Sequence, residues 1–187
     1  MYKIYDNYFE GLTGNNGSTA LNIPAGNADY GKGAPLTSAF RPQRIDIAFN
    51  TFVGNTHNIV IGNLHDRPPR DITIANNIVK GSQNKLVRID TDPTNMTWLG
   101  NIMYPTGTAT LGIPTTSSEI RVVDPLLTLS DGLKKILSNS PARDRAITRR
   151  PLTPSDVGVD APADGGGNAP PSALDDTAGQ TRTWRSP

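Results

Sequence analysis

The sequence predicts an all-β protein built as a parallel β-helix, in which successive coils of the chain stack on one another. Three observations predict this fold. Short segments with alternating apolar and polar residues, each typical of a strand, recur along the 187 residues. An asparagine recurs at one position of these units, with a period of roughly 25 residues. The 18 glycines and 16 prolines supply the many turns that such coils need.

The repeats align when four asparagines are superposed, in "YDNYFEGL", "AFNTFVGN", "ANNIVKGS" and "LGNIMYPT". These asparagines are Asn7, Asn50, Asn77 and Asn101. The last two intervals are 27 and 24 residues, and the first is 43 because residues 25–43 form an insertion. Stacked strands lie about 4.8 Å apart, so we expect the four side chains to form an internal ladder. Asn76, beside Asn77, is expected to be exposed.

A second apolar segment follows each asparagine. Val60 and Val87 both lie ten residues after their asparagines, so this spacing predicts that they occupy one inward row. Arg88 then points outward, with Ile61 in its row. A leucine-rich horseshoe also uses asparagine ladders, but its leucine frame and its helices are not visible here.

The chain divides into three predicted parts. Residues 1–128 form the β-helix coils, with the insertion at 25–43. Residues 129–160 form a C-terminal cover segment, in which residues 131–139 are a short helix or an extended stretch. Residues 161–187 are rich in Gly, Pro, Asp and Ala, which is typical of a flexible or partly disordered tail.

Composition excludes several classes of site and partner. The chain has no cysteine, which excludes disulfides and thiolate metal sites. It has no apolar run long enough to cross a membrane, and its net charge of +1 does not indicate a nucleic-acid partner. The opening "MYKIYDNYFEGL" is not a secretory signal, and it begins on an expected strand without a cap. We therefore expect an N-terminally truncated β-helix, or else a small one that caps itself by dimerising.

These motifs carry a family resemblance. "DNYFEGLTG", "ITIANNIV" and "WLGNIMY", with "VDPLL", "SPARD" and "DVGVD" further on, resemble the C-terminal half of the family 6 polysaccharide lyases over residues 2–160. Those enzymes are right-handed parallel β-helices with a pectate-lyase-like solenoid, and chondroitinase B is a relative. The resemblance implies β-elimination on a uronic-acid polymer, with alginate as the first candidate and dermatan or chondroitin sulfate as the next. It also implies a secreted or periplasmic bacterial enzyme.

The resemblance transfers no catalytic residue to this chain. In the family, a lysine in a segment like "NKS" is the base and an arginine in one like "LRHG" assists it, both on coils that precede the "NYFEGL" stretch. Neither segment occurs here. A calcium ion, which often neutralises the substrate carboxylate in these enzymes, would also be held by preceding coils. We therefore assign no catalytic residue, metal ligand or cofactor, and expect the chain alone to be inactive.

The candidate binding residues lie in residues 41–90, where seven cations face four acids. Arg67, Arg70 and Arg88, with His65 nearby, are expected to bind an anionic polysaccharide, because a guanidinium can hold a carboxylate with two hydrogen bonds. Alternatively, Arg67 and Arg70 pair with the aspartates of their own loop, and Arg88 pairs with Asp90 or Asp66. Two other functions stay open: a non-catalytic polysaccharide-binding β-helix module, and a structural or adhesin β-helix.

Overall fold

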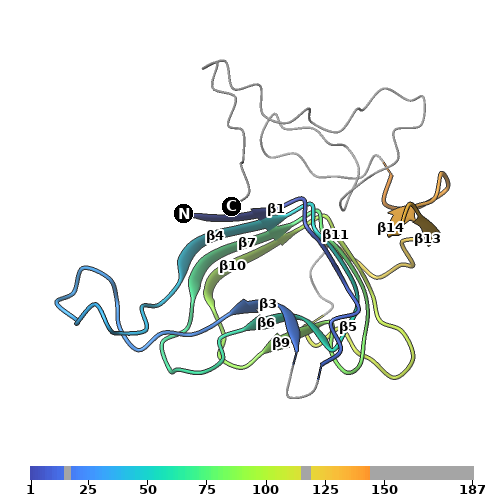
Figure 1. Ribbon diagram of the computed structural model, residues 1–187. Coiled ribbons are helices and arrows are strands. Elements are labelled where there is room, and N and C mark those ends of the chain that lie inside the picture. Colours follow the sequence, from blue (N-terminus) through green and yellow to red (C-terminus); the bar gives the residue numbers. More distant parts are fainter. Residues whose placement is uncertain (15–17, 115–118, 144–187) are drawn as a thin grey trace, which may run out of the picture.

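The computed structural model describes residues 1–14, 18–114 and 119–143, and this part of the chain is all-β, with no helix. Strands from successive repeats collect into three parallel sheets around one core (Figure 1). No helix among the described residues is long and apolar enough to span a membrane. The predicted tail at 161–187 and the "DVGVD" segment lie outside the described residues.

The first three repeats each contribute one strand to each of three sheets, and the fourth contributes β10 and β11 to the first two. Sheet one contains β1 (Tyr2–Tyr5), β4 (Gln43–Ala48), β7 (Arg70–Ala75) and β10 (Thr94–Leu99). Sheet two contains β2 (Tyr8–Glu10), β5 (Thr51–Asn55), β8 (Ile78–Ser82), β11 (Asn101–Tyr104) and β12 (Ile120–Arg121). Sheet three contains β3 (Thr19–Ile23), β6 (His57–Ile61) and β9 (Val87–Ile89). This parallel arrangement is compatible with a β-solenoid.

The strands pair in a register that stacks equivalent apolar residues. Ile47 pairs with Ile4 on one side and with Ile74 on the other. Ile47 and Ile74 are fully buried, and burying such a side chain contributes roughly 1.5–3 kcal/mol. The stacked rows therefore form one continuous apolar core.

The predicted register in sheet three is wrong by one residue. Val60, rather than Ile61, pairs with Arg88, and Ile59 pairs with Val87. The turn between β5 and β6 is shorter than the turn between β8 and β9, so equal counting from the asparagines shifts the alignment of the second repeat.

The four asparagines form the hydrogen-bonded ladder that the repeats predict. The Nδ2 atom of Asn7 donates to Oδ1 of Asn50 at 2.9 Å. Asn50 donates in the same way to Asn77, and Asn77 to Asn101, both at 3.0 Å. In each rung the backbone amide also donates to the same oxygen. The last three asparagines of the ladder therefore each satisfy donors that the bend between sheets one and two would leave unpaired.

The residue before each ladder asparagine makes this bend. Asp6, Phe49, Asn76 and Gly100 all have left-handed backbones, with φ between 54° and 61°. The expectation that Asn76 is exposed is wrong, because its exposed fraction is 2%. Strand alternation does not continue through a left-handed residue, so alternation could not place this side chain. Asparagine tolerates the left-handed region better than most residues, which explains the pair Asn76–Asn77.

Residues after the coils cover the outer face of sheet two. β13 (Leu127–Ser130) and β14 (Leu133–Ile136) form an antiparallel hairpin, drawn beside β11 in Figure 1. Residues 131–139 are therefore partly strand and not a helix. Ile136 and Ala142 pack on Ile78 and Ile102, which face away from the main core. The Nζ atom of Lys134 also lies 2.6 Å from Oε1 of Glu10 on β2.

Candidate functional site

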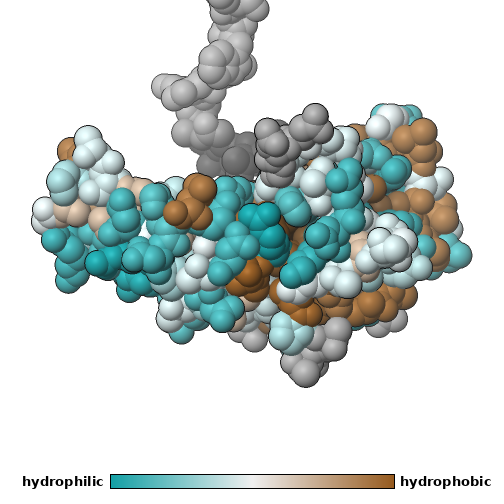
Figure 2. Space-filling model, turned by 90° about the horizontal axis from the view of Figure 1, so that it is seen from below, coloured by the Kyte–Doolittle hydropathy of each residue, from teal (hydrophilic) through white to brown (hydrophobic). Residues whose placement is uncertain are grey.

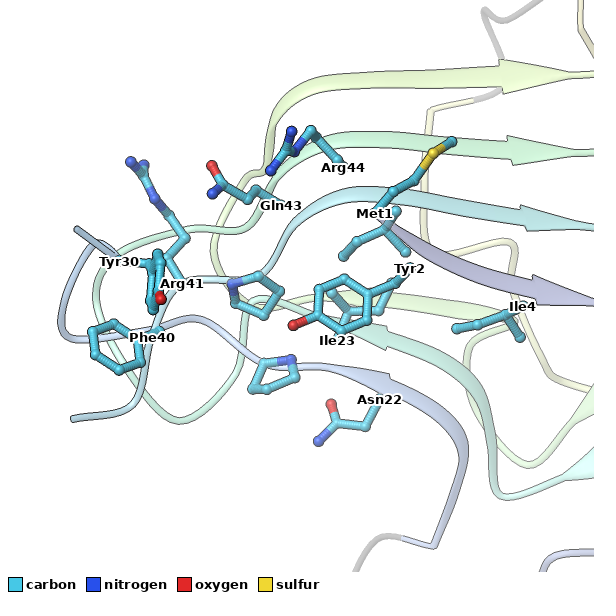
Figure 3. A pocket seen from close by; sticks show the side chains of 13 residues that line it. Met1, Tyr2, Ile4, Asn22, Ile23, Tyr30, Phe40, Arg41, Gln43 and Arg44 are labelled. Carbon is cyan, nitrogen blue, oxygen red and sulfur yellow. The ribbon is translucent and has the colours of Figure 1, made fainter. Parts of the chain in front are cut away.

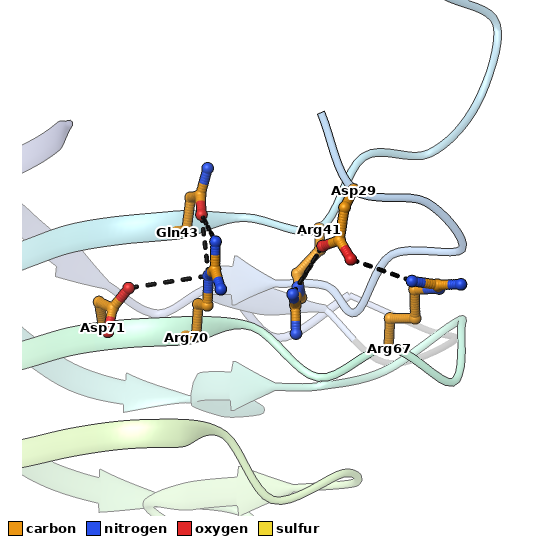
Figure 4. Close-up of polar contacts among 6 residues, drawn as sticks. All are labelled: Asp29, Arg41, Gln43, Arg67, Arg70 and Asp71. Carbon is orange, nitrogen blue, oxygen red and sulfur yellow. Dashed lines mark hydrogen bonds and ion pairs between the residues drawn. The ribbon is translucent and has the colours of Figure 1, made fainter. Parts of the chain in front are cut away.

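Four arginines gather at the edge where the strands of sheet one begin. We call Arg41, Arg44, Arg67 and Arg70 the arginine edge. Arg44 and Arg70 lie in the first residues of β4 and β7, and Arg41 and Arg67 lie in the segments that lead into these strands. In Figure 4, Arg70, Arg41 and Arg67 are spread along this edge.

Asp29 from the insertion bridges two of these arginines. Its Oδ1 atom lies 2.6 Å from Nη2 of Arg41, and its Oδ2 atom lies 3.0 Å from Nη1 of Arg67. Burial raises the pKa of the Asp29 carboxyl, but the hydrogen bond from Arg41 and the charges of Arg41, Arg67 and Arg70 outweigh it and hold this pKa below its ordinary value. Asp29 is therefore ionised at neutral pH, and it fixes the insertion to the sheet edge.

The other two arginines keep donors available. The Nε atom of Arg70 donates to Oε1 of Gln43 at 2.8 Å and lies 3.8 Å from Oδ2 of Asp71. Arg44 is exposed and makes no ion pair within the part of the chain that the structure describes. The side chains of Arg67 and Arg70 are 52% and 42% exposed. Four guanidinium groups thus face two carboxylates, which leaves the edge basic.

A pocket adjoins the arginine edge. Its volume is about 720 Å³, and Arg41, Gln43 and Arg44 line it on one side. Tyr30 and Phe40 of the insertion also line it, with their rings edge to face at 5.6 Å (Figure 3). The insertion extends away from the sheets at the left of Figure 1. Seen from below, hydrophilic residues cover much of this left side, while apolar residues gather toward the right (Figure 2).

The structure separates Arg88 from the arginines with which it was grouped. Arg88 lies on β9 in sheet three, where its Nη2 atom donates to Oδ2 of Asp90 at 2.9 Å. Its Nη1 atom lies 3.4 Å from Nε2 of His57. Burial and the Arg88 charge lower the pKa of His57, so its imidazole is neutral at neutral pH. The alternative pairing with Asp90 is the one observed, and Arg88 does not belong to the arginine edge.

The remaining candidates lie between β6 and β7. His65 is exposed in this loop, where its backbone amide donates to the carbonyl of Asn63, and it lies two residues from Arg67. Arg67 pairs with Asp29 of the insertion and not with Asp66 of its own loop, whereas Arg70 lies beside its neighbour Asp71. The structure therefore brings Arg67 and Arg70 to one edge.

Sequence reasoning missed Asp29, Tyr30, Arg41 and Arg44 as site residues. Three of them belong to the insertion and Arg44 borders it, and this insertion interrupts the repeat and has no equivalent in the other coils. Within the described residues, no three Asp, Glu or His side chains come together to hold a metal ion. The described residues therefore offer no ligand set for the calcium ion that the lyase resemblance implies.

The chain matches no family model, no curated protein and no solved structure.

Proposed function

We propose that this protein binds a uronic-acid polymer along the arginine edge, as a segment of a family 6-like polysaccharide lyase. The proposal includes the fold of that family, a right-handed parallel β-helix with a pectate-lyase-like solenoid. The polymer is alginate first, and dermatan or chondroitin sulfate next. In the complete enzyme, which would be secreted or periplasmic, the catalytic lysine and arginine would lie on coils that precede β1.

The excess of guanidinium groups at the arginine edge carries this proposal. A polyuronate presents one carboxylate per sugar, and Arg44, Arg67 and Arg70 are spaced along the start of sheet one with donors available. The planar fork of arginine suits bidentate contact with a carboxylate. Tyr30, which is 72% exposed beside this edge, offers a ring face for the apolar side of a sugar.

The chain by itself is expected to bind the polymer without cleaving it. β-Elimination needs a base at the carbon beside the carboxylate, and a group that stabilises the carbanion that forms. Arg41 and Arg67 share the carboxylate of Asp29, and Arg88 pairs with Asp90. These three arginines are therefore paired with carboxylates of the chain itself, and no base or carbanion-stabilising group is assigned among the described residues.

A calorimetric titration with polymannuronate at low salt tests the proposal. The variant Arg44→Gln/Arg67→Gln removes two exposed contacts, while Arg41 still holds Asp29. Each exposed contact contributes about 1 kcal/mol or less, so the affinity should fall about five- to tenfold. Added salt should weaken binding of the parent chain, because the contacts are exposed charges.

The matched control is Lys85→Gln/Arg121→Gln, which removes the same net charge at exposed positions outside sheet one, before β9 and on β12. It should bind nearly as tightly as the parent chain. Equal losses in both double variants would show a general charge effect and refute the site. Release of unsaturated uronate by the parent chain would refute the statement that the catalytic groups lie elsewhere.

A further inference from the structure

One carboxylate joins the outer part of the insertion to the arginine edge. The Asp29 carboxylate contacts Arg41 at 2.6 Å and 2.8 Å and Arg67 at 3.0 Å, and it lies between these two guanidinium groups in Figure 4. Beyond Asp29, the hydrogen bonds described for residues 30–38 stay inside the insertion. Leu36 in this stretch is 86% exposed. Within the described part of the chain, residues 30–38 therefore make no polar contact with the three sheets.

The base of the insertion is held without this carboxylate. Gly26 and Arg67 exchange two backbone hydrogen bonds, at 2.8 Å and 2.9 Å. The backbone amide of Arg41 donates to the carbonyl of Ala28 at 2.8 Å, and Ala28 is 8% exposed. Loss of the Asp29 side-chain contacts would therefore release residues 29–38 and leave the base of the insertion in place.

The ion pairs of Asp29 lie within reach of a dissolved carboxylate. The side chains of Arg41, Asp29 and Arg67 are 18%, 25% and 52% exposed. Ion pairs this close to water are weak, because solvent and salt screen them. A polyuronate presents carboxylates of the same chemistry. Once one of them contacts Arg44 or Arg70, its neighbour along the polymer is held beside Asp29 at a high local concentration. A polymer therefore competes with Asp29 far better than a single uronate does.

We propose that Asp29 is an internal competitor of the polymer. In the free chain its carboxylate occupies Arg41 and Arg67, and a bound polyuronate displaces it, takes both guanidinium groups and releases residues 29–38. The inference rests on the proposed function, since the ligand is the same polymer at the same arginine edge, and it adds the regulation of that site. The edge then offers four guanidinium groups to the polymer, in place of the two that do not contact Asp29 in the free chain.

An anchoring role for Asp29 makes the opposite prediction. If the carboxylate positioned Arg41 and Arg67 for the polymer, removing its charge would weaken binding. If it competes with the polymer, the same change strengthens binding. Asp29→Asn separates the two roles, because asparagine keeps the size of the side chain and loses its charge.

Calorimetric titration with polymannuronate at low salt compares the parent chain with Asp29→Asn. Freeing two partly exposed arginines should raise the affinity about five- to tenfold. The matched control is Asp90→Asn, which makes the same change in net charge and also frees an arginine, Arg88 on sheet three. It should bind nearly as tightly as the parent chain, so an equal gain in both variants would refute the inference. If the parent binds and Asp29→Asn binds no more tightly, the inference is wrong and the proposed function stands. Binding by neither chain would refute both.

Limited trypsin digestion of the full parent chain tests the release without any substitution. Lys32 is exposed within residues 29–38. Proteolysis of a local opening follows the population of the open form, so cleavage after Lys32 should be about threefold faster or more with saturating polymannuronate. Asp29→Asn should be cleaved at this faster rate with and without the polymer, which controls for an effect of the polymer on trypsin. Unchanged or slower cleavage after Lys32 in a parent chain that binds the polymer would overturn the inference.

Discussion

Replacing Asn77 by alanine should destabilise the protein strongly, because this residue lies inside the ladder with a rung on either side. The Asn77 side chain is fully buried. Its Oδ1 atom accepts from the backbone amide of Asn50 at 2.9 Å and from the Asn50 side chain at 3.0 Å. Its Nδ2 atom lies 3.0 Å from Oδ1 of Asn101 and 3.0 Å from the carbonyl of Ile47. Asn77→Ala therefore removes partners from several buried polar groups at once.

The size of the effect follows from these contacts. A buried donor or acceptor that loses its partner costs about 1–3 kcal/mol. Asn77→Ala removes the acceptor of the Asn50 backbone amide and a donor to the Ile47 carbonyl, while Nδ2 of Asn50 keeps the carbonyls of Ile4 and Ala48. We expect a loss of about 3–5 kcal/mol, a large share of the roughly 5–15 kcal/mol of a typical domain. Asn7→Ala is the matched control, because Asn7 is half-buried at the end of the ladder and accepts no bond from another described rung. It should cost about 1 kcal/mol.

Urea denaturation followed by circular dichroism measures both variants, and comparable slopes against urea establish that the unfolding transition is the same. The reasoning is refuted if Asn77→Ala costs no more than Asn7→Ala. That result would mean that the ladder bonds are replaced by water or by other partners, and that the repeat of asparagines does not stabilise the stack.

Three further predictions concern turns and charges. Gly54→Ala should cost about 1–2 kcal/mol of stability for its left-handed backbone, since the new Cβ meets nothing within 4 Å. Gly81→Ala should cost more, because its new Cβ would lie 2.9 Å from Thr106 Oγ1. Equal thermal shifts of the two variants would contradict this. The hydrogen bond from Lys134 lowers the pKa of Glu10 below 4.5. The stabilisation by ionised Glu10 is therefore present above pH 4.5 and is lost as the pH falls through the pKa of the folded state. Lys134→Met should make stability depend less on pH in this range, as measured by acid denaturation. NMR titration should place the pKa of His57 below 6.5, with stability lost as the pH falls from 6.5 toward the folded value, and a value at or above 6.5 would refute the burial argument.

The repeat could be predicted from sequence because each coil needs one asparagine at the same bend. Asn50, Asn77 and Asn101 recur at nearly constant intervals, and a single residue type with a structural role leaves a visible period. The register of sheet three could not be predicted, because it depends on the length of the turn between β5 and β6, which differs from that in the next coil. Counting ten residues from each asparagine therefore placed Val60 in the row of Val87, which Ile59 occupies in the structure.

The arginine edge was only half predictable. Arg67 and Arg70 stand out in a basic stretch, but the partner of Arg67 is Asp29, which is 38 residues earlier in the chain. No periodic pattern marks a contact made by an insertion, so the role of residues 25–43 is visible only in three dimensions. The sequence also grouped Arg88 with Arg67 and Arg70. Arg88 lies in sheet three instead, where it pairs with Asp90, two residues away.

The most direct test of the account is a hydrogen-exchange footprint of the parent chain with saturating polymannuronate at low salt. Binding at the arginine edge predicts slower exchange for amides in residues 41–44 and 67–71, with β9 and the β13–β14 hairpin unchanged. Protection confined to β9 around Arg88, or no protection in either arginine segment, would contradict the account.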